Sequence, residues 1–167
     1  MATLHMLVGI PGSGKSTYCR NYLSKKYPNA IVIASDIVRD NNPHLKEEDI
    51  WPEIYRLCGT ALKRGEDIIY DATNITPNVR NRFFNKLAEH DAVNYRKIAY
   101  YFTTDTKICE KRVSIRNTLP NERFLPVDVV AGYGQKIIMP TLEEGFEEII
   151  VVNNDEEVKD YNEKKFH

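Results

Sequence analysis

The residues with the clearest chemical meaning form the segment GIPGSGKST, from Gly9 to Thr17. They match the pattern G-x-x-x-x-G-K-[ST] at Gly9, Gly14, Lys15 and Ser16. Glycines let the backbone turn its N–H groups inward around phosphate oxygens. In this pattern Lys15 reaches the β- and γ-phosphates, and the Ser16 hydroxyl ligates Mg²⁺. The pattern therefore predicts a site for ATP, or another nucleoside triphosphate, with Mg²⁺ as the cofactor.

The segments around this loop have the setting that the pattern needs. An apolar run at residues 4–8 is typical of a buried strand, and residues 15–26 have the spacing of a helix. The positive end of that helix would add to the attraction for phosphate. The alternative is a glycine-rich turn between a strand and a helix, with an exposed lysine.

A second pair of candidate residues follows the next apolar strand, residues 30–34. An acceptor hydroxyl that attacks the γ-phosphate needs a group to orient it and take its proton, and the carboxylate of Asp36 can do both. Arg39, three residues later, has a planar guanidinium that can hold a phosphate or a carboxylate with two hydrogen bonds. The alternative is an ion pair between Asp36 and Arg39 on a surface turn.

The third strand, residues 68–70, ends at Asp71-Ala72-Thr73-Asn74. Asp71 could hold Mg²⁺ through a water molecule or orient the acceptor, whereas its alternative is a helix cap or a local turn. We therefore predict that the acceptor side is lined by Asp36, Arg39, Asp71, Thr73 and Asn74.

Arg112 and Arg116 are one helical turn apart, just before a polar loop at residues 117–125. A lid delivers guanidinium groups to β- and γ-phosphates in this way, and the alternative is a solvated helix face. The lid is expected at about residues 112–126. The predicted nucleotide-binding residues are Gly12, Ser13, Gly14, Lys15, Ser16, Thr17, Arg112 and Arg116. The predicted catalytic residues are Lys15, Asp36, Arg39 and Arg116.

The order of elements predicts the fold that must position these residues. Strands at 4–8, 30–34, 68–70, 95–102 and 146–152 alternate with helical segments. This order indicates an α/β fold of the P-loop kinase type. A parallel five-stranded sheet in the order 2-3-1-4-5 would be flanked by helices and topped by a helical lid. In such sheets ligands collect at the carboxyl ends of the strands, where the candidate residues lie.

Boundaries of the helices follow from local signals. Thr76-Pro77 and Thr104 are expected to cap helices, and Pro52 is expected at a first helical position or a kink. Pro126 should open a helix that runs to about Met139. A polar tail from about residue 153 is predicted to be a short helix or disordered.

Length and composition limit the classes of protein to which the chain can belong. At 167 residues the chain is expected to be one domain, residues 1–167, and its net charge of −1 argues neither for nor against a polyanionic partner. Three cysteines without a CxxC pair suit a reducing compartment, so we expect a cytoplasmic protein. Apolar runs are too short for a membrane span. A homo-oligomer is left open.

Together, the segments GIPGSGKST, ASDIVRD, YDATN, KRVSIRN and RFLPVDVV resemble, in order and spacing, the kinase domain of polynucleotide 5′-kinases. The resemblance is to the phage end-healing kinase and to the kinase module of bacterial RNA end-repair enzymes, from residue 4 to about 139. It implies transfer of the ATP γ-phosphate to a 5′-hydroxyl of DNA or RNA. By this resemblance Asp36 is the general base and Arg39 grips the 3′-phosphate of the acceptor.

The same resemblance implies that Lys15 and Ser16 contact phosphate and Mg²⁺, and that Arg112 and Arg116 are lid arginines. No phosphatase or ligase domain follows, which predicts a lone kinase or a module of a larger enzyme. Two other functions stay open. Small-molecule kinases for gluconate, shikimate or an antibiotic share the loop, sheet and lid, and a non-catalytic nucleotide-binding module would need no base.

Overall fold

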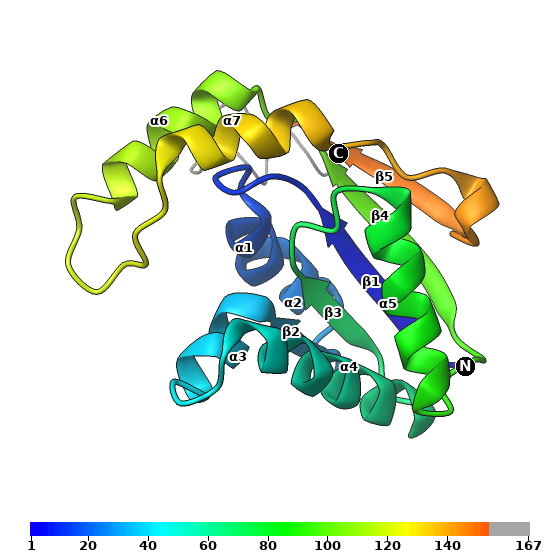
Figure 1. The fold of residues 1–167 in the computed structure, drawn as a ribbon. Helices are drawn as coiled ribbons and strands as arrows, with labels where there is room; N and C mark the ends of the chain where they lie inside the picture. Colours follow the sequence, from blue (N-terminus) through cyan, green and yellow to red (C-terminus); the bar gives the residue numbers. More distant parts are fainter. Residues whose placement is uncertain (154–167) are drawn as a thin grey trace.

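The computed structural model describes residues 1–153 and shows one five-stranded sheet (Figure 1). The strands are β1 (Thr3–Val8), β2 (Ile31–Ala34), β3 (Ile68–Asp71), β4 (Arg96–Phe102) and β5 (Glu148–Val152). Their order is β2-β3-β1-β4-β5, and every neighbouring pair is parallel. The predicted sheet is therefore confirmed. The predicted tail beyond Asn153 lies outside the described residues.

Helices connect the strands. The first is a continuous helical segment made of α1 (Lys15–Tyr18), a π-helical stretch η1 (Cys19–Leu23) and α2 (Ser24–Lys26). The others are α3 (Ser35–Asn41), α4 (Glu47–Lys63), α5 (Pro77–Glu89), α6 (Thr106–Arg116), α7 (Val127–Lys136) and the 3₁₀ turn η2 (Leu142–Glu144). The predicted cap of α5 is confirmed, because the Thr76 hydroxyl accepts from the Val79 N–H.

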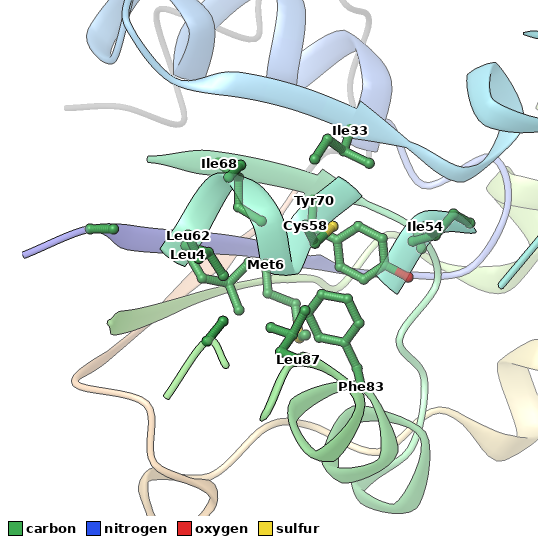
Figure 2. Packing of buried hydrophobic residues seen from close by; sticks show 14 of the residues in the cluster. Leu4, Met6, Ile33, Ile54, Cys58, Leu62, Ile68, Tyr70, Phe83 and Leu87 are labelled. Carbon is green, nitrogen blue, oxygen red and sulfur yellow. The ribbon is translucent and has the colours of Figure 1, made fainter. Parts of the chain in front are cut away.

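Alternation along β1 divides the core between the two faces of the sheet. Leu4 and Met6 point to one face, where they pack with residues of α4 and α5 (Figure 2). There the rings of Tyr70 and Phe83 stack with their centroids 4.3 Å apart. Leu7 points to the other face and packs with side chains of the α1–η1 segment. Both faces are buried, as expected for a parallel sheet.

A third, smaller cluster supports the candidate site. It consists of Ile10, Ile75, Cys109, Val113 and Val130, which come from the phosphate loop, the turn before α5, α6 and α7. The antiparallel pair α6–α7 thus packs on the loops at the carboxyl ends of the strands, and its connecting loop extends beyond the sheet (Figure 1).

The segment after β2 differs from expectation. Residues 35–41, where no helix was predicted, form the helix α3 directly after Ala34. Asp36 lies in its first turn, where an acid suits the positive end of a helix. Seven residues are too few to show helical periodicity in a sequence. The helix α3 ends at Asn41, and the Asn42 side-chain amide donates to the Val38 carbonyl.

Pro52 lies inside α4, so of its two predicted positions the first helical one is excluded. Two local boundaries were wrong. The cap of α6 is Asp105, whose carboxylate accepts from the Lys107 N–H, while the Thr104 hydroxyl instead donates to the Ser13 carbonyl at 2.9 Å. The helix opened by Pro126 ends at Lys136, because the next residue is extended.

Candidate active site

The phosphate loop has the backbone conformation that its glycines predict. Gly12 and Gly14 have φ angles of +84° and +94°, a region that favours glycine. Gly12 also has no room for a side chain, because a Cβ there would lie 2.7 Å from the carbonyl oxygen of Cys109 in α6. The loop is therefore held against the first helix of the lid pair.

Lys15 is folded over its own loop. Its Nζ donates to the carbonyl oxygens of Gly9 at 2.9 Å and Ile10 at 3.0 Å. Burial lowers the pKa of Lys15, whereas the carboxylates of Asp71 and Asp36 act to raise it. Asp71 bonds Ser16, the neighbour of Lys15. It also pairs across the sheet with Ala34, two residues before Asp36, so the sheet edge brings these predicted site residues together.

Ser16 and Asp71 form the candidate metal position. The Ser16 Oγ donates to the Asp71 Oδ2 at 2.7 Å, and Asp71 is only 8% exposed. Within residues 1–153 there is no group of three or more His, Cys, Asp or Glu side chains that could hold a metal. Mg²⁺ typically takes one or two protein oxygens and completes its shell with phosphates and water. The hydroxyl–carboxylate pair fits that mode of binding.

The segment after β3 is tied to β1 and to the phosphate loop. The Gly9 N–H donates to the Thr73 carbonyl at 3.1 Å, and the Asn74 amide donates to the Leu7 carbonyl at 2.8 Å. Asn74 is buried and has a φ angle of +47°. These contacts give both residues a positioning role, and their predicted contact with the acceptor stays a prediction.

Arg80, on α5, holds the segment after β3 in place, and the sequence did not predict this role. Its side chain is fully buried, and it donates to the Asn74 carbonyl at 2.7 Å and to the Glu144 Oε1 at 2.6 Å. Burial acts to raise the pKa of Glu144, but hydrogen bonds from Arg80 and the Thr141 backbone outweigh it and lower that pKa. An arginine on a helix otherwise looks like a surface residue, so no local signal marked Arg80.

The predicted acceptor side is a cluster of charged groups around Arg39. Arg39 donates to the Asp36 Oδ1 at 2.7 Å and to the Glu47 Oε1 at 2.7 Å, with its Nε also bonded to Glu47. The guanidinium lies over the Trp51 ring, 5.4 Å from the centroid. The hydrogen bonds to Glu47, above all, raise the pKa of Arg39 despite its partial burial. The ion pair with Asp36 exists, but it is one part of a larger cluster.

Glu47 and Trp51 are the members of this cluster that sequence reasoning did not assign to the site. Glu47 begins α4, where an acid is common at the positive end of a helix. Two further acids, Glu48 and Asp49, follow it directly. Because all three suit the helix start, the sequence does not indicate which one meets Arg39.

Of the two predicted lid arginines, Arg112 contacts the phosphate loop directly. Arg112 donates from Nη1 to the Gly12 carbonyl at 3.1 Å. Arg116 is exposed, and its positive charge acts on the ammonium group of Lys15. The helix α6 thus places both predicted arginines on the donor side. Their contact with a nucleotide stays a prediction.

A third arginine, Arg123 in the loop at residues 117–126, faces the acceptor side. Its Nε lies 3.7 Å from the Asp36 Oδ1, and its Nη2 forms a short ion pair with the Asp40 Oδ1. Arg39 and Arg123 both line a cleft of about 370 Å³ between α3, the start of α4 and this loop.

Comparison with known proteins places this architecture in a family. Residues 4–134 match the AAA domain family. The chain belongs to this family. Within residues 1–153 of this AAA domain protein, no helix is long and apolar enough to cross a membrane.

Similarity to individual proteins extends over most of the chain. It is 26% identical over 156 residues to a mimivirus protein (Acanthamoeba polyphaga mimivirus) described as a bifunctional polynucleotide phosphatase/kinase. The alignment covers 88% of this chain and 32% of the relative, so the chain spans about a third of that protein's length.

Two solved structures show the same fold. A chain of the Pnkp1/Rnl/Hen1 RNA repair complex superposes with a TM-score of 0.68 and 24% identity, covering 81% of this chain and 43% of that one. A gluconokinase from Sinorhizobium meliloti superposes with a TM-score of 0.60 and 15% identity, covering 96% of this chain and 86% of that one. The AAA domain protein therefore has the P-loop kinase fold.

Proposed function

We propose that this AAA domain protein is a kinase that transfers the γ-phosphate of ATP to the 5′-hydroxyl of a DNA or RNA end. The observation that carries the proposal is the position of Asp36. Asp36 follows β2 at the edge of the sheet where Ala34 pairs with Asp71 and Asp71 bonds the phosphate-loop residue Ser16. Its exposed carboxylate is paired with an arginine that can hold an anionic acceptor. Phosphoryl transfer needs a proton acceptor at this point between donor and acceptor.

The donor half of the reaction would use the phosphate loop and α6. Backbone N–H groups of the loop would cradle the β-phosphate, and Lys15 would exchange its bonds to Gly9 and Ile10 for phosphate oxygens. Arg112 and Arg116 would then neutralise charge that develops on the transferred group. Ser16 and Asp71 would hold Mg²⁺, which when bound would supply positive charge against the phosphates.

In the acceptor half, the 5′-oxygen forms a bond to the γ-phosphorus while the bond from that phosphorus to the bridging oxygen of ADP breaks. The proton of the 5′-hydroxyl passes to the Asp36 carboxylate. Arg39 would grip the 3′-phosphate of the same nucleotide, the next anionic group along the chain. The mimivirus relative, named for polynucleotide phosphatase/kinase activity, supports this choice of acceptor.

A second candidate function is phosphorylation of a small carboxylate-bearing alcohol. It is favoured by one observation, that Arg39 holds the carboxylate of Glu47 with bonds from both Nε and Nη2. A gluconate- or shikimate-like acceptor would present the same group to the same guanidinium.

The two candidate functions are distinguished by the acceptor that the protein phosphorylates. Transfer from labelled ATP is measured with a nucleoside 3′-monophosphate, the same nucleoside without that phosphate, a 5′-hydroxyl oligonucleotide, gluconate and shikimate. We expect the nucleoside 3′-monophosphate and the oligonucleotide to be phosphorylated and the unphosphorylated nucleoside to be poor. Arg39→Ala should erase most of that preference, about 1.5–3 kcal/mol for a charge-assisted contact, and Arg39→Lys should restore part of it. Transfer to gluconate or shikimate alone would contradict the proposal.

A further inference from the structure

The loop that joins α6 to α7 carries a cation to the acceptor side. Arg123 lies 83 residues from Asp40 in sequence, yet its Nη2 pairs with the Asp40 carboxylate. Its Nε is 3.7 Å from the Asp36 Oδ1, the same oxygen that accepts from Arg39. Two arginines, one from α3 and one from the lid loop, thus approach one oxygen of the proposed base.

The position of Arg123 is set by the base of its loop. The Asn117 amide donates to the Leu125 carbonyl at 2.8 Å, and the Leu125 N–H donates to the Asn117 Oδ1 at 3.0 Å. Leu125 also packs against the small cluster beneath α6 and α7. Because these contacts close the loop two residues after Arg123, its side chain starts from a defined point and faces α3.

The cleft between the two arginines is suited to an anion. Arg39 and Arg123 line it, together with Asp40 and Glu47. In the free protein the two guanidiniums are neutralised by Asp36, Asp40 and Glu47, whose side chains are all more than half exposed. Exposed ion pairs of this kind contribute little to stability, so a bound anion can replace them at small cost. Guanidinium pairs favour phosphate, which offers several oxygens at once.

We propose that Arg123 is a second acceptor-binding residue, which joins Arg39 in binding the phosphate next to the acceptor's 5′-hydroxyl. The inference rests on the proposed function and extends it to the lid. Arg112 and Arg116 on α6 would bind the donor, and Arg123 in the adjoining loop would bind the acceptor. The continuous segment of α6 and its loop would therefore contact both substrates. Binding of the phosphate draws both guanidiniums away from Asp36 and leaves its carboxylate for the hydroxyl proton.

The test compares Arg123→Ala, Arg123→Lys and a matched control, Arg56→Ala. Arg56 suits this purpose because it forms an exposed ion pair with Glu53 on α4, and its side chain is 54% exposed against 47% for Arg123. The KM for a nucleoside 3′-monophosphate should rise about tenfold or more in Arg123→Ala, the loss expected for a charge-assisted contact, and less in Arg123→Lys. The KM for ATP and every constant of Arg56→Ala should stay within about twofold of wild type.

A direct measurement of acceptor binding tests this inference independently of the proposed function. Calorimetry measures the Kd of the nucleoside 3′-monophosphate for the full chain, with no transfer required. Weaker binding by Arg123→Ala, alongside a wild type that transfers no phosphate, would support the acceptor site and refute the kinase assignment. Unchanged binding by Arg123→Ala would overturn the inference. Equal losses in kcat/KM for nucleosides with and without the 3′-phosphate would also overturn it, since Arg123 would then act through Asp36 alone.

Discussion

The donor and acceptor sides of the candidate site are built in different ways. On the donor side, Asp71 bonds Ser16 of the phosphate loop and Asn74 bonds the Leu7 carbonyl of β1, so these two buried residues, predicted to line the acceptor side, are held by the donor side of the site. On the acceptor side, the Asp36 side chain is 67% exposed and is held by ion pairs from Arg39 and Arg123. Buried, hydrogen-bonded groups are costly to disturb, whereas exposed ion pairs exchange partners easily.

This difference explains how one fold can accept different substrates. The donor is always a nucleoside triphosphate, so its site can be rigid and made largely of backbone groups. The acceptor varies, so its site consists of charged side chains that a ligand can displace. Gluconokinase and the RNA repair complex share the fold of this chain at under 25% identity, which agrees with a fold that is separate from acceptor choice.

The largest effect should come from the donor side. Lys15→Ala should raise the activation free energy of transfer by several kcal/mol and so lower kcat on the order of 10³-fold. The reason is that one positive group that stabilises the developing phosphate charge is lost. The protein should remain folded, since Lys15 bonds only to carbonyls of its own loop among the hydrogen bonds described for residues 1–153. Transfer assays with labelled ATP and a thermal melt check both points. Retention of more than about a tenth of wild-type turnover would refute the role of Lys15.

Asp36→Asn should break the acceptor side and spare the donor side. The amide keeps the size of the carboxylate but cannot take the hydroxyl proton, so transfer should fall about 10²- to 10⁴-fold. Affinity for ATP, measured by calorimetry, should stay close to that of wild type. If affinity and transfer fell together, Asp36 would be a ligand of the nucleotide or metal, and the base would lie elsewhere.

Substitutions on the two sides should also change the free energy of unfolding by different amounts. Arg80→Ala removes the buried partner of Glu144 and of the Asn74 carbonyl, and should lower the free energy of unfolding by about 3–5 kcal/mol. Urea unfolding measures this change.

Glu47→Gln is the matched control on the acceptor side. It removes the charge of a residue that also pairs with an arginine, but here the acid is exposed, so unfolding should change by less than about 1 kcal/mol. Equal losses in the two variants would show that the acceptor side is as rigid as the donor side.

A separate effect concerns acid and the strand β1, which leads into the phosphate loop. His5 on β1 is 1% exposed, and its Nδ1 lies 2.8 Å from the Tyr100 hydroxyl. Burial lowers the pKa of His5 to about 4, against an opposing effect of Asp67. The unfolded chain therefore binds a proton below about pH 6.5 that the folded protein does not, and stability falls from there to about pH 4.

Because of His5, the free energy of unfolding should fall by about 3–4 kcal/mol over this pH range. Urea unfolding of wild type and His5→Phe across this pH range measures it, because the phenyl ring can keep the packing against Tyr27 without titrating. His44→Gln, at an exposed position, is the control and should follow wild type. An equal pH dependence in His5→Phe would assign the acid sensitivity to other groups.

Much of the architecture followed from local patterns in the sequence. Alternating apolar strands and helices predicted the sheet, its order and the position of the phosphate loop, because side-chain periodicity and the geometry of parallel connections leave few arrangements. The left-handed conformations of Gly12 and Gly14 were predictable for the same reason, since the motif acts through its backbone. The helix α3 was not predicted, because it is too short for helical periodicity to appear in the sequence.

Only the tertiary structure decided which charged groups meet. Arg39 pairs with Glu47 across 8 residues, Arg80 with Glu144 across 64, and Arg123 with Asp40 across 83. A sequence shows that cations and acids are present, but each arginine has many acids to choose from. The choice depends on which elements the packed core brings together, and on whether that core also excludes water from the pair, as it does for Arg80 and does not for Asp36.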